Sequence, residues 1–272
     1  MHDRSLVAVP ERQGQRDTDG SNGVVRLEVV ACGGFNGDIR NWLDLFTLQR
    51  HDRRAIYDLH YRKPTPIADR NDVCEIDERL SADGTIVENL DASRLENQVR
   101  AFLADGDYDA VAICLLHSYT NPDHERLVAE AVSRCAPTMP VTCSSDVSRE
   151  FREYERASTT ALAAYVQPVI EGYLNRLSDT LDARRLQGRF SIMQSNGGRM
   201  PAKAMAKNAI SALFSGPAAG VVGAMGLAAR AGFQDIITLD MGGTSADLSL
   251  VYQGAPLLTN AYAVEFNIPI SL

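Results

Sequence analysis

Three absences in this 272-residue sequence exclude whole classes of protein. No stretch approaches the roughly 20 apolar residues that span a bilayer. The first residues contain charged side chains but no apolar run like that of a signal peptide. The five cysteines include no C-x-x-C pair and indicate no disulfide framework. We therefore expect a protein of the cytoplasm.

Positive charge is also scarce relative to negative charge. The formal net charge is −8, which argues against a nucleic-acid or anionic-membrane partner. Apolar residues make up 45% of the chain and charged residues 23%, as in soluble globular proteins. The length allows one large domain or two modest ones, and we find no internal repeat.

The most informative stretch is 236–251, IITLDMGGTSADLSLV. Two runs with strand-like composition flank Gly242 and Gly243, which predicts a β-hairpin with a Gly-Gly turn. Glycines let the backbone approach a ligand closely, and their N–H groups can line an anion site. Asp240, at the end of the first strand, is placed to hold Mg²⁺, and Thr244 adds a hydroxyl. The alternative is an ordinary hairpin whose Asp and Thr satisfy the turn.

The rest of the chain alternates strand and helix signals, which predicts an α/β architecture. Residues 110–116 form a short continuous apolar run, typical of a strand buried on both faces. The longest helical stretch is 149–185, which Pro168 should kink or split. Further helices are expected at 94–104, 121–135, 201–212 and 217–231. A strand followed by a loop is expected at 141–148, and a further strand at 190–195.

The segment 214–232, FSGPAAGVVGAMGLAARAG, is a second candidate for chemistry. Ser215 can cap the helix, and Pro217 suits its first turn. Gly216 belongs to a face of very small residues, which would permit close packing against a sheet. The free N–H groups of such a helix start could instead bind an anion.

Two charged segments each allow a structural and a functional interpretation. The first, HSYTNPDHE (117–125), could hold a metal, but Asn121 and Pro122 are also a plausible helix start, and His117 a hydrogen-bonded loop residue. The second, REYERASTT (152–160), places Arg152 and Arg156 at i,i+4, where like charges repel. Pairs with glutamates at i,i+3 would explain them, as would contact of Arg156 with another lobe or subunit.

Several segments of the sequence resemble the hydantoinase/oxoprolinase family in the family's own order. They are GGFNGDIRNWLDLFTLQRHDRRAIYDL (33–59), CLLHSYTNPDHE (114–125), REYERASTTALAAYV (152–166), IMQSNGG (192–198), FSGPAAGVVGA (214–224) and DMGGTSADLSLV (240–251). Ala246 departs from the family pattern, which usually has Thr there. The resemblance implies an actin- and sugar-kinase-like (ribonuclease H-like) ATPase fold, here incomplete.

The resemblance also implies a domain organisation. Family members resemble two-lobed ATPases with one phosphate hairpin in each lobe, and residues 1–32 contain no such motif. We expect 1–32 to be a polar leader, 33–188 an α/β region of the first lobe, and 189–272 the start of the second lobe. The chain thus resembles an internal portion of a larger protein.

By resemblance, the function is ATP-dependent hydrolysis of a cyclic amide of the hydantoin or 5-oxoproline type, with Mg²⁺. Asp240 would be the catalytic and metal-binding residue. The residues expected to bind ATP are Gly242, Gly243, Thr244, Ser215 and Gly216. A hydantoinase B-like subunit or the missing lobe would be the partner, and a homo-oligomer is a further expectation. The alternatives are an ATP-dependent ketone carboxylase subunit and a non-catalytic fragment or interaction module.

Overall fold

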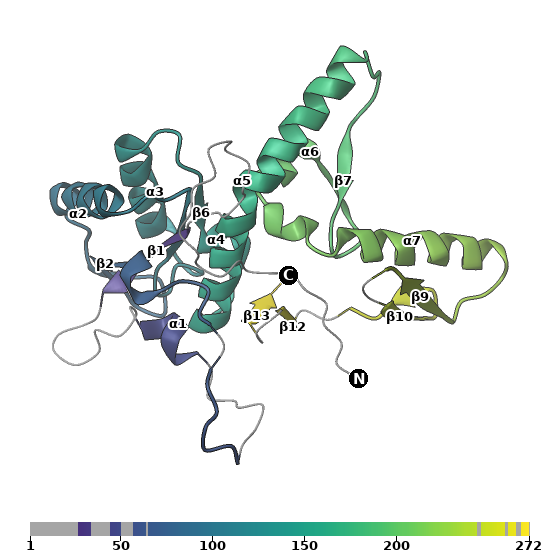
Figure 1. The fold of residues 1–272 in the computed structure, drawn as a ribbon, viewed down its shortest axis with the longest axis horizontal. Helices are drawn as coiled ribbons and strands as arrows, with labels where there is room; N and C mark the ends of the chain where they lie inside the picture. The colour runs from purple at the N-terminus through teal and green to yellow at the C-terminus, as the bar shows by residue number, and fades with distance from the viewer. Residues whose placement is uncertain are drawn as a thin grey trace. The chain divides into compact units, whose positions relative to one another are not determined.

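The computed structural model describes residues 27–33, 44–49, 57–63, 65–243, 246–258, 261–264 and 268–271. The chain forms two compact units, an N-terminal unit built on residues 25–168 and a C-terminal unit built on residues 169–265. The division falls inside the longest helix, α5 (Glu153–Ala183; Figure 1). No helix among the described residues is long and apolar enough to cross a bilayer.

The N-terminal unit is organised around a parallel four-stranded sheet with the order β2-β1-β5-β6. Its strands are β1 (Leu27–Gly33), β2 (Val73–Asp77), β5 (Ala110–Cys114) and β6 (Val141–Cys143). All five residues of β5 are buried, which confirms the strand predicted from the apolar run at 110–116. Because β5 is central in the sheet, residues that follow it emerge at the middle of the sheet's carboxyl edge.

Helices cover both faces of β5, and its alternating side chains divide between them. On one face, Val111 and Ile113 join the apolar side chains of α2 (Ala92–Asp105) and α3 (Asp123–Cys135). These two helices lie side by side in Figure 1. On the other face, Ala110, Ala112 and Cys114 meet a row of alanines from α5, namely Ala157, Ala161 and Ala164. The small side chains allow α5 to approach the sheet closely.

Shorter elements complete the N-terminal unit. They are α1 (Leu45–Leu48), the 3-10 turn η2 (Arg70–Asp72), the hairpin of β3 (Arg79–Leu80) with β4 (Ile86–Glu88), and α4 (Ser144–Val147). The leader expected over 1–32 overlaps β1 at residues 27–32, and residues 1–26 lie outside the described residues.

The C-terminal unit is more open and has a smaller core. Leu174, Met205 and Ala206 are its clustered buried residues. After α5 come β7 (Ser191–Met193), β8 (Arg199–Pro201), α6 (Ala202–Met205), the 3-10 turn η3 (Ala209–Ala212), α7 (Ser215–Arg230), β9 (Ile236–Met241), β10 (Ala246–Tyr252) and β11 (Ala255–Pro256). The short strand β12 (Ala261–Val264) follows, whereas β13 (Ile268–Ser271) is grouped with the N-terminal unit.

Two sequence expectations about helices need correction. Pro168 does not split the predicted helix, because α5 runs from Glu153 to Ala183 with the proline inside it, and the kink stays a prediction. The helix expected over 201–212 is instead α6 and the separate turn η3. The domain boundary expected between residues 188 and 189 stays a prediction.

Candidate functional site

The hairpin predicted over 236–251 is confirmed by the pairing of β9 with β10. The strands are antiparallel, with Leu239 opposite Leu248 and Asp240 opposite Asp247. Gly242 and Gly243 follow β9 and are exposed. Thr244, expected to contact phosphate, lies outside the described residues.

The register gives the hairpin two different faces, because residues directly opposite each other share a face. One face is apolar and exposed, with Ile237, Leu239, Met241, Leu248, Leu250 and Tyr252 each more than half exposed. The other face carries the pairs Ile236–Val251, Thr238–Ser249 and Asp240–Asp247. A Cβ atom built on Gly220 of α7 would lie 3.9 Å from Oδ2 of Asp240, so α7 covers this second face.

Two carboxylates therefore stand opposite each other beside the glycine turn. Like charges directly opposite on neighbouring strands repel. No group of three or more histidine, cysteine or acidic side chains suited to a metal occurs among the described residues. Mg²⁺ is commonly held by one or two carboxylates, with water and substrate phosphates as the remaining ligands. Asp240 and Asp247 match that pattern of ligation.

The start of α7 differs from its expected form. The helix begins at Ser215, and the N-cap residue is Phe214, in the left-handed region with φ 59°. Ser215 makes no capping hydrogen bond because it already lies in the helix, so its predicted capping role is wrong. A Cβ on Gly216 would meet nothing within 4 Å, which leaves the backbone here accessible. Gly216 precedes Gly220 by one helical turn, about 6 Å along the axis.

A second polar cluster lies in the N-terminal unit, at the carboxyl edge of the sheet. Its centre is Glu125, which is fully buried on α3. One carboxylate oxygen accepts from the backbone N–H of Leu115 at 3.0 Å and from Ser144 Oγ at 2.6 Å. The other accepts from the N–H and Oγ of Ser145 at 2.9 and 2.7 Å. The carboxylate thus joins α3 to the ends of β5 and β6.

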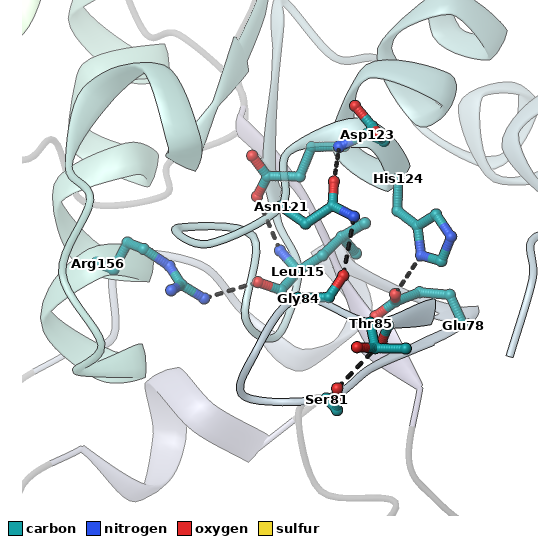
Figure 2. A network of polar contacts seen from close by, with 10 residues as sticks. Glu78, Ser81, Gly84, Thr85, Leu115, Asn121, Asp123, His124 and Arg156 are labelled. Atoms are coloured by element: carbon teal, nitrogen blue, oxygen red, sulfur yellow. Dashed lines mark hydrogen bonds and ion pairs between the residues drawn. The ribbon is translucent and has the colours of Figure 1, made fainter. Parts of the chain in front are cut away.

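Arg156 of α5 holds the same backbone segment from the other side. It is fully buried, and its guanidinium donates to the carbonyl of Leu115 at 2.6 Å and to that of Glu150 at 3.0 Å. The guanidinium carbon lies 5.3 Å from the ring centre of Tyr119, within cation–π range. Figure 2 shows Arg156 reaching Leu115. Leu115 therefore has both backbone polar groups bound by buried, ionisable side chains.

Polar contacts also tie the turn after β5 to the β3–β4 hairpin (Figure 2). Asn121 donates from its side-chain amide to the carbonyl of Gly84 at 3.0 Å and accepts from the N–H of Asp123 at 3.0 Å. The second contact lies just before α3, which begins at Asp123 with Pro122 as its N-cap, so the predicted N-cap at Asn121 is wrong by one residue. His124 Nδ1 lies 2.6 Å from Glu78 Oε2, and both side chains are buried.

Burial and charge shift the pKa of several groups around this cluster. Burial raises the pKa of the Cys114 thiol, and burial together with Glu125 raises the pKa of Cys143 to about 12. Burial lowers the pKa of His117, and the positive charge of Arg79 lowers it further. Burial opposes the charge of Arg156, but the effects of Cys114 and of nearby acidic residues outweigh it and raise the pKa.

Sequence reasoning missed the roles of Glu125 and Arg156. The repulsive spacing of Arg152 and Arg156 was a usable signal, since it indicated that one of them has a different partner. Arg156 binds the backbone carbonyls of Leu115 and Glu150. Nothing in the sequence connected Glu125 with residues 144 and 145. The Ser144 and Ser145 contacts arise only when β5 and β6 pair.

Two models of one family match most of the chain. The hydantoinase/oxoprolinase N-terminal region matches residues 38–136, and the hydantoinase/oxoprolinase model matches residues 156–271. The chain belongs to the hydantoinase/oxoprolinase family. The predicted family membership is therefore confirmed.

Relatives and solved structures agree with this family. An uncharacterised protein of Methanocaldococcus jannaschii is 34% identical over 88% of this chain and 34% of its own length. Caprolactamase subunit alpha of Pseudomonas jessenii is 32% identical, over 71% of this chain and 28% of its own length. This hydantoinase-family chain thus spans about a third of the length of these relatives.

The solved structures share the fold. A nucleotide-free structure of acetone carboxylase aligns with a TM-score of 0.75 at 28% identity, covering 91% of this chain and 35% of that one. The ATP-dependent caprolactamase of Pseudomonas jessenii aligns with a TM-score of 0.74, at the same identity and coverage. The predicted fold class is confirmed: the chain has a partial α/β fold that it shares with these members of the hydantoinase family.

Proposed function

We propose that this chain supplies a phosphate- and Mg²⁺-binding hairpin to a larger enzyme that hydrolyses a cyclic amide at the expense of ATP. One observation carries the proposal. The β9–β10 register sets Asp240 opposite Asp247, immediately before the exposed Gly242 and Gly243. Family membership adds support, since a caprolactamase and an acetone carboxylase with this fold are both described as ATP-dependent.

The hairpin suits Mg²⁺ and ATP on physical grounds. A divalent cation would remove the repulsion between Asp240 and Asp247 and leave coordination positions for phosphate oxygens. The backbone N–H groups of the glycine turn suit an anion. The N-terminus of α7, with Ser215 and Gly216, begins about one turn before the residue that faces Asp240, so its free N–H groups add to the positive potential.

Phosphoryl activation fits the chemistry of the substrate class. An amide carbon is a weak electrophile and its oxygen a poor leaving group, and ATP supplies a phosphoryl group that changes both. Such a reaction needs positioning and electrostatic stabilisation more than a covalent protein nucleophile. The hairpin offers the side-chain carboxylates of two aspartates and the backbone N–H donors of the glycine turn, which serve those needs.

A partner chain is part of the proposal. The caprolactamase relative is a subunit by name, and this chain spans about a third of it. We propose that a hydantoinase B-like subunit, or the polypeptide corresponding to the rest of the relatives, completes the site. We also propose the cytoplasm as its compartment, since the spacing of the five cysteines in the sequence indicates no disulfide framework.

An ATP-dependent ketone carboxylase subunit is a second candidate. The structural similarity to acetone carboxylase equals that to caprolactamase, with TM-scores of 0.75 and 0.74. The same phosphoryl activation would serve a ketone oxygen. Turnover assays with a lactam, a hydantoin and a ketone plus bicarbonate separate the two activities.

A non-catalytic interaction module is the third candidate, and the 272-residue chain alone tests it. A nucleotide site supplied from one side leaves the phosphates solvated, where each contact contributes little. We expect the chain alone to show no appreciable ATP-dependent ring opening, with weak binding of Mg·ATP at the hairpin. Absence of nucleotide binding at the hairpin would favour the module.

The decisive variant for the proposed function is Asp240→Ala in the assembled enzyme. It should reduce ATP turnover by about 10²–10³-fold, the range seen when one electrostatic group is removed from an active site. Asp179→Ala, an exposed carboxylate on α5 in the same unit, is the matched control and should leave turnover unchanged. Near-normal turnover in Asp240→Ala would remove Asp240 from the mechanism.

A further inference from the structure

One segment of the C-terminal unit is basic in a chain whose overall charge is negative. The sequence holds 35 acidic residues in 272, about one in eight, yet none occurs between Asp182 and Asp235. Six basic residues lie in the first half of that interval, over 184–207, and the side chains of all six are exposed. We call them the basic surface: Arg184, Arg185, Arg189, Arg199, Lys203 and Lys207. The proposed function leaves them without a role.

Backbone contacts bring the two ends of this segment together. The N–H of Ala202, at the start of α6, donates to the carbonyl of Phe190 at 3.3 Å. Arg189 and Lys203 are the immediate neighbours of these two residues, so the fold places their positive charges close to each other. The loop after α5 and the start of α6 therefore carry one continuous group of basic residues, although they are far apart in the chain.

The hairpin of β7 and β8 separates this basic group from the apolar core. Ile192 and Met200 are opposite each other in the hairpin and pack against the buried cluster that contains Leu174 of α5 (Figure 1). Successive residues of a strand point to opposite faces. The next pair, Met193 and Arg199, therefore belongs to the other face of the hairpin, away from that core. The core thus holds the segment in place while its basic side chains stay in solvent.

Local structure explains only part of the basic surface. Arg184 and Arg185 follow the last residue of α5, where positive charge complements the helix dipole. That explanation does not extend to the other four residues, which lie on a loop, a strand and the segment around α6. In the part of the chain that the structure describes, no ion pair involves any of the six. Exposed like charges of this number create a positive potential that attracts an anionic partner.

The surroundings of the basic surface favour protein carboxylates over other polyanions. Phe190 is the only aromatic residue in 184–207 and is half-buried, whereas proteins bind single-stranded nucleic acid by stacking bases on accessible aromatic rings. The net charge of −8 repels a long polyanion or an anionic bilayer outside this surface. Leu186, which is 51% exposed, lies among the arginines, and protein–protein interfaces combine arginine with apolar side chains.

We propose that the basic surface is a docking site for a carboxylate-rich surface of a partner protein. Four of its six residues are arginines, whose planar guanidinium groups can bind a carboxylate through two parallel hydrogen bonds. The inference rests on the proposed function only for the existence of a partner chain. It adds which part of this chain meets that partner and what chemistry the partner presents.

Fluorescence anisotropy of a labelled polyglutamate peptide of about 20 residues tests the proposal with the 272-residue chain, without ATP or Mg²⁺. At about 50 mM NaCl we expect saturable binding with a dissociation constant on the order of 10–100 μM. Binding should weaken at least tenfold at about 500 mM NaCl, because salt screens exposed charges. An oligouridylate of the same length and vesicles that contain phosphatidylserine should bind at least tenfold more weakly than the peptide.

Charge reversal shows whether the peptide binds at the basic surface. Arg184→Glu combined with Arg189→Glu should weaken peptide binding at least tenfold. The matched control is Arg126→Glu combined with Arg134→Glu, at two exposed arginines of the N-terminal unit. Both double variants change the net charge by the same amount, so a general charge effect would weaken binding equally. The control should weaken binding less than twofold.

A second double variant makes the result independent of the folding of the first. Lys203→Glu combined with Lys207→Glu alters the basic surface on the other side of the contact between Phe190 and Ala202. It should weaken peptide binding by a similar factor. Both lysines are exposed, so the substitutions leave the apolar core of the C-terminal unit unchanged.

Specific outcomes would overturn the inference. No saturable binding of the peptide, or an equal loss in the surface variants and the control, would leave the six residues as ordinary solvated charges. Tighter binding of the oligouridylate would indicate a nucleic-acid site, and tighter binding of the vesicles a membrane site; either would exclude the proposed protein partner. A negative result leaves Mg·ATP binding at Asp240 untouched, so it is distinguishable from a failure of the proposed function.

Discussion

The two polar clusters in this chain follow strands in a similar way but differ in what satisfies them. In the N-terminal unit, Glu125 and Arg156 are fully buried and bound by backbone and hydroxyl groups of the protein. In the C-terminal unit, Asp240 is exposed and stands opposite another carboxylate. Protein partners complete the first cluster, whereas we propose that a cation from outside completes the second.

This difference separates positioning groups from binding groups. A buried charge with protein partners contributes to a defined backbone geometry, here that of the Leu115–His117 turn. An unrelieved pair of like charges destabilises the free protein slightly and favours a ligand that neutralises it. Substitutions should therefore affect folding in the first cluster and ligand binding in the second.

The largest expected effect is loss of stability at Arg156. Arg156→Met removes the donors to Leu115 and Glu150 and the positive charge near buried Glu125. We expect a loss of about 3–5 kcal/mol in the free energy of unfolding, as for other broken buried charge networks. Urea denaturation measures it. The exposed Arg152→Met is the control and should stay within about 0.5 kcal/mol of wild type. A similarly small change in unfolding free energy for both variants would show that Arg156 does not stabilise the buried cluster.

Alanine substitutions at two glycines of the C-terminal unit should change the stability of the chain by smaller amounts and in opposite directions. A Cβ at Gly223 of α7 would meet nothing within 4 Å, so Gly223→Ala should stabilise the chain by about 0.5–1 kcal/mol through helix propensity. Gly197 has φ +81°, and a Cβ there would lie 3.0 Å from Val222, so Gly197→Ala should destabilise. Thermal unfolding compares them. Destabilisation by Gly223→Ala would show that this glycine serves close packing after all.

The smallest expected effect is a pH dependence at His117. Its pKa is lowered in the folded chain, so the unfolded chain binds the proton first as the pH falls. Stability should therefore decline as the pH drops from about 6.5, the ordinary histidine value, to the folded pKa, and level off below it. Arg79→Gln should raise the NMR titration midpoint of His117, since the positive charge of Arg79 lowers its pKa. An unchanged titration midpoint would show that the charge of Arg79 does not lower the pKa of His117.

Local sequence signals were sufficient for the hairpin and the central strand. Composition and the Gly-Gly turn specified β9 and β10, and the apolar run specified β5 as buried on both faces. The start of α3 was predicted to within two residues, because Asn121 and Pro122 are local signals. These features share one property, which is that the composition of the segment itself indicates its structure.

Features that depend on partners distant in the chain could not be predicted from the sequence. The bond from Arg156 to Leu115 spans 41 residues, and that from Ser144 to Glu125 spans 19. The N-cap of α7 is Phe214 instead of the predicted Ser215, because Phe214 takes a left-handed conformation that composition does not disclose. The opposition of Asp240 and Asp247 needed the observed register, since a shift of one residue would have moved the two carboxylates to different faces.

Binding of Mg·ATP to the β9–β10 hairpin can be measured by amide NMR of the 272-residue chain. We expect saturable, Mg²⁺-dependent shifts centred on Asp240, Gly242 and Gly243, absent in Asp240→Asn and retained in Asp179→Asn. The affinity should be weak, with a dissociation constant on the order of 1 mM. Shifts centred elsewhere, or identical shifts in wild type and Asp240→Asn, would show that the hairpin is not the Mg·ATP site.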